Sequence, residues 1–200
     1  MPIYRLEGMT PSIADSAYVH PSAEIIGDVT IEAHCYIAPG AVLRGDFGHI
    51  HVHHHSNVQD NCVLHSFPEQ DCIVSAYGHI GHAAVLHGCV LENNVLIGMN
   101  SVIMDQTQIA KNAIVAANSF VPSNFTCEPG ALIVGSPATV KRTLSEREIN
   151  WKSEGTAHYV QLASRYLNSC ELVQREDLSD APDTNQRASV NFQYKPDKSD

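Results

Sequence analysis

The chain has few basic residues for its length. Lysine and arginine together number 12, against 22 aspartates and glutamates, and the formal net charge is −10. A negative charge of this size argues against nucleic acid or an anionic membrane surface as the main partner. The 200 residues, of which 44% are hydrophobic, suffice for one domain with a proper core, alone or as an oligomer.

Long apolar runs and a secretion signal are also missing. No stretch of about 18 apolar residues occurs, and the N-terminal MPIYRLEG lacks the basic and apolar regions of a signal peptide. The six cysteines form no CxxC pair or compact framework, which predicts reduced thiols, with Cys72 in an exposed loop. These absences favour a cytoplasmic protein that binds neither membrane nor nucleic acid.

What the sequence does contain is a repeat of six residues. Apolar residues, here called rungs, recur at this spacing along most of the chain. This excludes an amphipathic helix, with its period of about 3.6, and a hairpin meander, with its period of two. The repeat predicts an all-β fold, a parallel β-helix. The sixteen rungs are Val19, Ile25, Ile31, Ile37, Leu43, Val52, Val58, Leu64, Ile80, Leu86, Leu91, Ile97, Ile103, Ile109, Val115 and Val121.

The residue four positions after each rung is mostly small, as a tightly packed interior corner requires. Three hexapeptides make one triangular coil, and neighbouring coils stack about 4.8 Å apart. Sixteen rungs therefore predict five coils and a little more. The longest interruption separates Leu64 from Ile80 by sixteen residues, and we interpret residues 66–79 as a loop outside the prism.

Three regions follow from this pattern. Residues 1–140 are predicted to form the β-helix domain. Residues 141–176 form a C-terminal helical segment, with a capping box at Ser145 and Glu148. The polar residues 177–200 are predicted to be a flexible tail.

The loop also determines which rungs stack. The step from Leu64 to Ile80 is four residues longer than two repeats. If the loop absorbs these four residues, Val58 and Ile80 share one face, and Leu43, Leu64 and Leu86 share the next. A residue that follows an inward rung points outward, because side chains alternate along a strand. The outward column on the second of these faces comprises Arg44, His65 and His87. At the preceding corner, Gln59 and Asp60 lie beside Gly81 and His82.

This column suggests a metal site. His82 and His87 are five residues apart, which excludes a helical HExxH-type site. His65 and His87 lie about 5 Å apart on neighbouring coils and can approach one ion. His82 leaves the prism at another corner, so if all three are ligands the third comes from a neighbouring molecule of a trimer. Three imidazoles with an open position are typical of a catalytic, water-activating zinc, although iron and cobalt suit imidazole too.

Several motifs carry a family resemblance that covers residues 1 to about 175. They resemble the signature run of the γ-class carbonic anhydrases and their homologues, and most closely the branch that acts in phenylacetate degradation. The motifs are Leu43-Arg44-Gly45-Asp46, Asn57-Val58-Gln59-Asp60-Asn61, Val63-Leu64-His65, Ile80-Gly81-His82, Leu86-His87-Gly88-Cys89, Phe67-Pro68-Glu69-Gln70-Asp71 and Ile133-Val134-Gly135-Ser136-Pro137-Ala138.

The resemblance implies a left-handed parallel β-helix with a C-terminal α-helix, assembled as a homotrimer with metal sites at the subunit interfaces. It implies zinc bound by His65 and His87 of one subunit and His82 of the next. It also implies four further roles. These are an interface ion pair of Arg44 with Asp60, support of that pair by Asp46, positioning of the zinc-bound water by Gln59, and contact with substrate or hydroxide by Tyr159.

Two positions depart from the family pattern. The carbonic anhydrases carry glutamates near the metal as a proton relay, whereas here Phe47 follows Asp46 and Glu69 is the loop's only glutamate. Fast CO2 hydration needs rapid proton export. We therefore expect a zinc-dependent thioesterase for CoA thioesters of phenylacetate degradation, in which zinc-bound hydroxide attacks the thioester carbonyl. Carbonic anhydrase is the alternative, followed by a hexapeptide acyltransferase or a non-catalytic assembly protein.

Other polar residues are open to two interpretations. His51, His53, His54 and His55 look like a second metal cluster, but a solvated corner is favoured. His79 is interpreted as an ordinary loop histidine, in preference to a group near the metal. The candidates for binding CoA phosphates, among which the sequence does not select, are Lys141, Arg142, Lys152 and Arg165.

Overall fold

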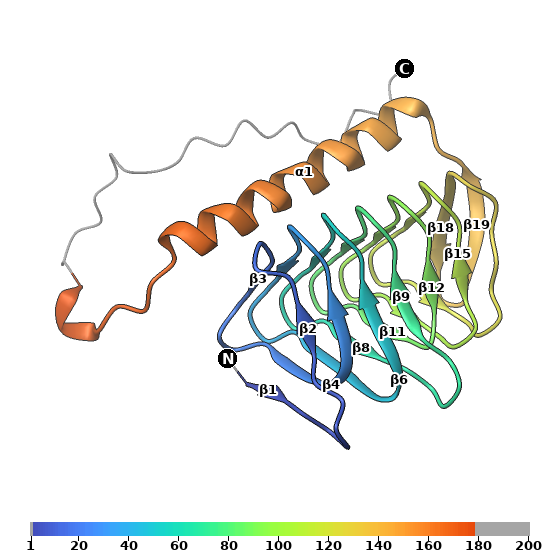
Figure 1. Cartoon of the computed structure of the whole chain (residues 1–200). Helices are drawn as coiled ribbons and strands as arrows, with labels where there is room; N and C mark the ends of the chain where they lie inside the picture. Colours follow the sequence, from blue (N-terminus) through green and yellow to red (C-terminus); the bar gives the residue numbers. More distant parts are fainter. Residues whose placement is uncertain (1, 179–200) are drawn as a thin grey trace.

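A computed structural model describes residues 2–178. These residues form a three-sided parallel β-helix with one long helix, α1 (Glu146–Ser169), along its side (Figure 1). The 3-10 helix η1 (Arg175–Asp177) follows. Within the described range, no helix has the length and apolar character needed to cross a membrane. Residues 179–200, most of the predicted tail, lie outside the described part of the chain.

The strands are arranged in three faces, named here for what they carry. The helix face comprises β3 (Tyr18–Val19), β5 (Tyr36–Ile37), β7 (Asn57–Val58), β10 (His79–Ile80), β13 (Leu96–Ile97), β16 (Ile114–Val115), β18 (Ala131–Gly135) and the antiparallel β19 (Ala138–Thr143). The histidine face comprises β1 (Ile3–Tyr4), the first parts of β4 (Glu24–Ile31) and β6 (Val42–Val52), β8 (Val63–His65), β11 (Val85–His87), β14 (Val102–Ile103) and β17 (Phe120–Val121). The third face comprises β2 (Ser12–Ile13), the last parts of β4 and β6, β9 (Cys72–Val74), β12 (Val90–Leu91) and β15 (Gln108–Ile109).

The predicted rungs form the core. Every one is at most 1% exposed except Val19, which is half-buried. Burying a side chain of this kind contributes about 1.5–3 kcal/mol, so the stack of rungs is the main source of stability. The small residues four positions later are buried as well, with Cys35, Cys62 and Ala84 at 0% exposed. The predicted all-β parallel β-helix with a C-terminal helix is therefore confirmed.

The predicted stacking of the rungs is also confirmed. Val58 pairs with Ile80 on the helix face. On the histidine face, Leu64 pairs with both Leu43 and Leu86. The residues that follow these rungs therefore occupy adjacent outward positions, and they are the ones that build the candidate site.

The prediction of a loop over residues 66–79 is wrong in its extent. Strand β9 lies inside the prism, and its Val74 pairs with Val52 and with Leu91. Val74 precedes Ile80 by six residues and so fits the repeat. The excursion is limited to residues 67–71, which make a short turn closed by a bridge between Phe67 and Gln70.

Two further predictions need correction. Cys72 belongs to β9 and is 0% exposed, so it is a core residue and not part of an exposed loop. The solenoid has about seven coils and not five, because the helix face holds seven parallel strands beside the antiparallel β19. The predicted absence of disulfides is confirmed, since all six cysteines are free.

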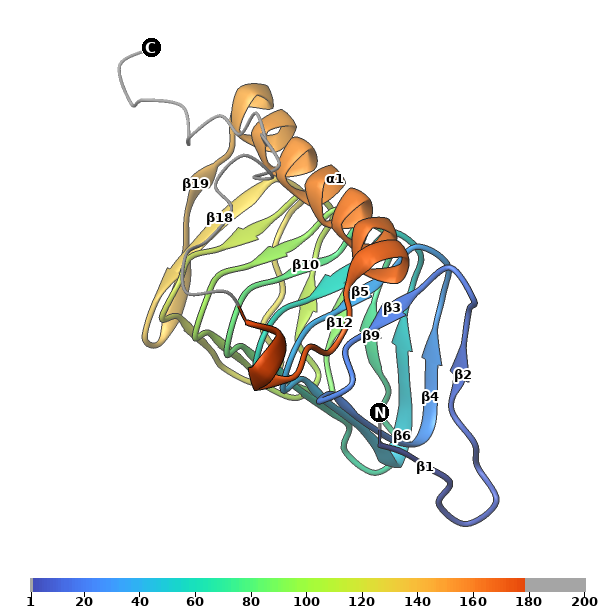
Figure 2. The ribbon, with the colours of Figure 1, turned by 90° about the vertical axis from the view of Figure 1, so that its left-hand side faces the viewer.

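Helix α1 begins as predicted. Ser145 is its N-cap and forms a reciprocal capping box with Glu148, whose carboxylate is also paired with Arg142. The helix runs across the helix face from the β19 end towards β3 (Figure 2). Its tyrosines pack against Tyr18 and Tyr36, which are both buried. The helix thereby covers one side of the prism and brings its own side chains towards the candidate site.

The corners of the prism depend on residues in the left-handed backbone region. Asparagine fills this position at five of the six successive corners after β12, with φ between 58° and 63° at Asn94, Asn100, Asn112, Asn118 and Asn124, while Gln106 fills the sixth. Asparagine tolerates this conformation better than other residues that carry a Cβ. The amide of Asn100 also donates to Oδ1 of Asn118 at 2.7 Å, one coil further on.

Replacement of Asn118 by alanine should lower the free energy of unfolding by about 1 kcal/mol, because alanine is strained in the left-handed region. Asn118→Gly is the matched control, since glycine loses the same hydrogen bond but adopts this backbone without strain. Urea unfolding at one protein concentration measures both. Equal midpoints for the alanine and glycine variants would contradict the assignment of the loss to backbone strain.

Candidate metal centre

Two histidines of the histidine face stand side by side. His65 ends β8 and His87 ends β11, and the two strands pair in register at these residues. Nδ1 of His65 lies 3.0 Å from Nε2 of His87, and the ring centroids are 5.0 Å apart. The inward rungs Leu64 and Leu86 precede them and are fully buried, so both imidazoles are directed outward.

A carboxylate holds the far nitrogen of each ring. Oδ1 of Asp46 lies 2.8 Å from Nε2 of His65, and Oδ1 of Asp105 lies 2.5 Å from Nδ1 of His87. An ionised carboxylate can only accept, so both of these ring nitrogens are donors. The two nitrogens that face each other are then acceptors in the neutral rings. Two converging lone pairs favour a cation, and a carboxylate behind each imidazole is the usual arrangement at metal-binding histidines.

Asp46 is fixed from two sides. Arg44 forms an ion pair with one of its oxygens, while His65 takes the other. Burial raises the pKa of Asp46, but the hydrogen bonds from His65 and Arg44 outweigh this effect and lower the pKa overall. The carboxylate is therefore ionised near neutral pH. It can only accept a hydrogen bond, so Nε2 of His65 is the donor.

His82 lies elsewhere, in the turn between β10 and β11. Its side chain is 46% exposed, and its Nδ1 is 2.7 Å from Oδ2 of Asp60. In residues 2–178, the one group of three or more ligand side chains whose donor atoms all lie within 4.8 Å of one another is Glu32, His51 and His53. His82 is thus not gathered with His65 and His87 within one chain, as the register predicts.

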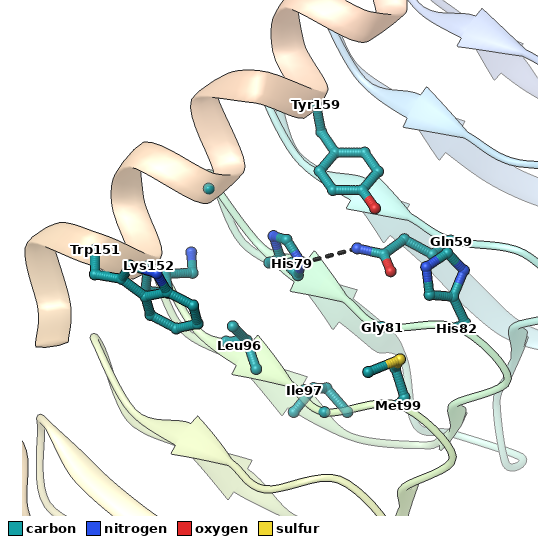
Figure 3. Close-up of a pocket in the computed structure, with 12 residues that line it drawn as sticks. Gln59, His79, Gly81, His82, Leu96, Ile97, Met99, Trp151, Lys152 and Tyr159 are labelled. Carbon is teal, nitrogen blue, oxygen red and sulfur yellow. Dashed lines mark hydrogen bonds between the residues drawn. The ribbon is translucent and has the colours of Figure 1, made fainter. Parts of the chain in front are cut away.

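A pocket opens beside His82, between the helix face and α1. Its cavity measures about 340 Å³. Figure 3 shows Gln59, His79 and His82 close together, Tyr159, Trp151 and Lys152 on α1, and the apolar Leu96, Ile97 and Met99 below them. The lining residues are Gln59, His79, Gly81, His82, Leu96, Ile97, Gly98, Met99, Trp151, Lys152, Gly155 and Tyr159.

Gln59 and His79 form the polar wall of this pocket. Nε2 of Gln59 lies 2.8 Å from Nε2 of His79 and donates to Oδ1 of Asn57 at 3.0 Å (Figure 3). Burial, with smaller effects of Lys152 and His82, lowers the pKa of His79 to about 3. His79 is therefore neutral and can accept the hydrogen bond from Gln59, which fixes the direction of the glutamine amide.

Tyr159 reaches the pocket from α1. Its ring meets His79 edge-on at 5.2 Å and lies 5.7 Å from the ring of Tyr36. Figure 3 shows its hydroxyl directed towards Gln59. Burial raises the pKa of Tyr159, so the phenol keeps its proton at neutral pH and can donate to a bound group.

Comparison with known proteins shows which family has this architecture. The family model "Bacterial transferase hexapeptide (six repeats)" matches residues 10–45 and 88–123. The carnitine operon protein CaiE of Salmonella agona (strain SL483) is 48% identical over 165 residues, which cover 82% of this chain and 83% of CaiE. The chain belongs to this hexapeptide-repeat family.

Solved structures of the family have the same fold. A Bacillus cereus protein provisionally named an acetyltransferase has a TM-score of 0.81 and 32% identity, covering 82% of this chain and 95% of its own. A hexapeptide transferase family protein from Anaplasma phagocytophilum has a TM-score of 0.80 and 34% identity, covering 82% and 98%. None of these three relatives carries a name that mentions zinc, thioester hydrolysis, CO2 hydration or phenylacetate.

In this hexapeptide-repeat chain the predicted site residues fall into two groups. One group lies on the histidine face and comprises Arg44, Asp46, His65 and His87; the other lies around the pocket and comprises Gln59, Asp60, His82 and Tyr159. Within the chain, Arg44 pairs with Asp46, and Asp60 pairs with His82. The Arg44–Asp60 pair expected between subunits remains a prediction.

Two residues of the site were missed by sequence reasoning. Asp105 follows His87 by 18 residues, the length of one coil, so the repeat itself carried the signal for it. The sequence predicts an ordinary loop histidine at His79, but this residue lies on β10 and supports Gln59. Its role depends on the cover that α1 provides, which the periodicity does not reveal.

Lys152 does not fit the suggestion that it holds CoA phosphates. It is 2% exposed, and its Nζ donates to the carbonyl oxygen of Tyr77 at 2.6 Å and to Oδ1 of Asn94 at 2.8 Å. Burial lowers the pKa of Lys152 to about 7. The lysine anchors α1 to the solenoid and is not available to a phosphate. Arg142 is committed to Glu148 by two hydrogen bonds.

The lowered pKa of Lys152 predicts a pH dependence of stability. In the unfolded chain the amine titrates at about 10.4, so between pH 7 and 10 the unfolded state binds more protons and stability from this group rises with pH. Relative to Lys152→Met, the wild type should gain about 2 kcal/mol of unfolding free energy between pH 7 and pH 9. Denaturant unfolding at both pH values measures the difference, with the exposed Lys141→Met as control. A constant difference would show that Lys152 is charged when buried.

Proposed function

We propose that this chain is a hydrolase of acyl-CoA thioesters whose zinc site is shared between subunits. The observation that supports the proposal most directly is the pair of facing imidazole nitrogens on His65 and His87, each backed by a carboxylate. Asp46 and Asp105 already satisfy the other two ring nitrogens, and a divalent cation is the partner that two converging acceptors favour. When bound, zinc supplies an activated water and a Lewis acid for the thioester carbonyl.

The third ligand in this proposal is His82 of a neighbouring subunit. Its Nδ1 is held by Asp60, which leaves Nε2 at the exposed end of the ring. Hexapeptide-repeat proteins are usually trimers, and a threefold axis would place one corner of each prism against the histidine face of the next. The two groups of site residues, separate in one chain, would then complete each other at every interface.

The pocket beside His82 suits the acyl group. Leu96, Ile97, Met99 and Trp151 provide apolar surface, and Gln59 and Tyr159 provide two polar groups near its mouth. Such a combination of apolar lining with few directed polar groups is typical of small-molecule sites. Both N–H groups of Gln59 are engaged by His79 and Asn57, so its Oε1 can accept a hydrogen bond from the attacking water. The protonated Tyr159 can donate to the developing oxyanion. Aryl thioesters such as phenylacetyl-CoA are the first substrates to test.

An acyltransferase is the second candidate, and the family comparison favours it. The matching family model is named for transferases, and a relative of 32% identity is provisionally named an acetyltransferase. Both candidates use an acyl-CoA donor and differ in the acceptor, which is water for a thioesterase and an amine or hydroxyl for a transferase. The acceptor therefore decides between them.

Carbonic anhydrase activity is less well supported. The ring of Phe47 lies 5.5 Å from that of His65, where the family pattern has a glutamate. Glu69 lies in the exposed turn of the excursion. An apolar ring beside the histidine pair cannot pass protons to bulk water, and fast CO2 hydration depends on that step.

Mixing two inactive variants tests whether the site is shared. His82→Ala and His87→Ala should each lose one equivalent of zinc per chain and nearly all thioesterase activity. Random trimers refolded or co-expressed from equal amounts of both should regain about a quarter of the wild-type sites, because one interface in each mixed trimer is intact. Zinc analysis and CoA release measure the recovery. A mixture as inactive as its components, despite proven mixed assembly, would contradict a shared site.

The acceptor is tested by following free CoA. Zinc-loaded protein should release CoA from aryl or aliphatic thioesters without any added acceptor. Release that requires an amine or hydroxyl compound would establish the transferase. In a separate zinc titration, Asp105→Asn should weaken zinc binding by about 10- to 100-fold. Strong CO2 hydration in stopped flow would contradict the inference that Phe47 prevents fast proton export. Full zinc loading without turnover of any thioester would indicate a non-catalytic assembly protein.

A further inference from the structure

A second cluster of metal-ligating side chains lies on the third face, away from the histidine pair. His51, near the end of β6, and His53, just after it, point outward from alternate positions of the chain. Glu32 follows β4 on the preceding coil, and its backbone N–H donates to the carbonyl of Val52, between the two histidines. The stacking of coils therefore places an acidic side chain from one coil against two imidazoles from the next.

The three side chains converge on one point. Oε1 of Glu32 lies 2.8 Å from Nε2 of His51 and 3.0 Å from Nδ1 of His53. The two imidazoles stack with their centroids 3.8 Å apart and their planes at 20°. The backbone N–H of His54 donates to Oε2 of Glu32 at 2.9 Å, which keeps Oε1 turned towards the rings.

We propose that Glu32, His51 and His53 bind a divalent transition-metal ion, with zinc as the preferred ion. Two histidines and one glutamate are an established zinc ligand set that leaves a fourth position open to water. The donor atoms all lie within 4.8 Å of one another, in a cluster whose side chains are 24–33% exposed and so can be reached from solvent.

The cluster needs little rearrangement to accept an ion. With metal bonds of about 2.0–2.1 Å in a tetrahedron, neighbouring ligand atoms lie about 3.3 Å apart. The observed separations of 2.8 and 3.0 Å therefore have to widen by a few tenths of an ångström. A neutral imidazole can carry its proton on either ring nitrogen, so binding exchanges the two hydrogen bonds to Glu32 for three metal bonds without loss of a proton.

The neighbouring histidines are engaged in other contacts. His49 is held by Asp28 at 2.8 Å, and its ring meets that of His51 edge-on at 5.3 Å. Nδ1 of His55 lies 2.7 Å from that of His54, and the ring of His55 stacks on Tyr77. The ligand set is therefore limited to three side chains. The sequence favours a solvated corner here because three of the histidines are consecutive in a turn. The structure adds an acidic partner, Glu32, 19 residues before His51.

The bound ion would join adjacent coils near one end of the solenoid. Glu32 follows β4, and the two histidines lie at and just after the end of β6, so the ligands come from two successive coils. A ligand that binds only the folded state stabilises it by mass action. The proposed site does not depend on the His65–His87 pair, which lies on the histidine face, nor on any activity there.

Metal analysis of the whole protein in the His87→Ala background tests the site, because that substitution removes the other proposed site. After dialysis against zinc, this protein should retain one zinc per chain. Adding His53→Ala or the near-isosteric Glu32→Gln should lower zinc affinity at least about tenfold, since even residues that only support ligands have effects of that size. His55→Ala is the matched control from the same corner and should retain the zinc.

Cobalt and thermal unfolding give two further readouts. Co2+ added to the His87→Ala protein should produce visible absorption bands of a tetrahedral site, and zinc should raise its melting temperature; both effects should disappear with His53→Ala but not with His55→Ala. Zinc binding that is equal in all variants, or absent from the His87→Ala protein while circular dichroism shows it folded, would overturn the proposal. Because the readouts are metal binding and stability, failure of the thioesterase proposal would leave this result unaffected.

Discussion

The register between neighbouring coils is the constraint on which the rest of the structure depends. Backbone hydrogen bonds join each strand to the strand one coil away, and alternation along a strand then leaves no freedom in which side chain faces outward. Leu64 and Leu86 are fully buried and paired, so His65 and His87 have to stand next to each other on the surface. A slip of one residue would bury both imidazoles and expose both leucines. The hydrophobic energy of the core therefore also maintains the geometry of the polar site.

The same register explains how much could be read from the sequence. Positions that are separated by whole coils follow from counting, and the column of Arg44, His65 and His87 was predicted in this way. Val74 was missed although it lies six residues before Ile80, because the four surplus residues before it disguised the repeat. The contacts made by α1 could not be predicted by counting residues along the repeat. A helix and a solenoid have unrelated periods, so the burial of Lys152 and the neutral state of His79 depend on a packing angle that neither pattern contains.

In the structure, several of the acidic side chains lie next to histidines. A carboxylate oxygen lies within 3.0 Å of a ring nitrogen of His49, His51, His53, His65, His82 and His87. Carboxylates in this role select the tautomer of a histidine and set the direction of its free nitrogen. Five of the 22 acidic residues thus orient imidazoles. It need not repel an anionic substrate such as a CoA ester, whose charge is concentrated in phosphates far from the thioester.

The histidine pair and His82 differ in how firmly they are held. This difference suggests why the proposed activity would depend on assembly of subunits. His65 is held in place by a buried strand and an ion-paired aspartate, and its side chain is 10% exposed, whereas the His82 side chain is 46% exposed in a turn. The pocket with Gln59 and Tyr159 opens on the side of His82, not on that of the pair. In the proposed arrangement, two ligands on a rigid face and a third beside the pocket would form a site only where two subunits meet. Coil stacking can position residues along one prism with precision, but it cannot bring two faces of the same prism together; association of prisms would overcome that limit.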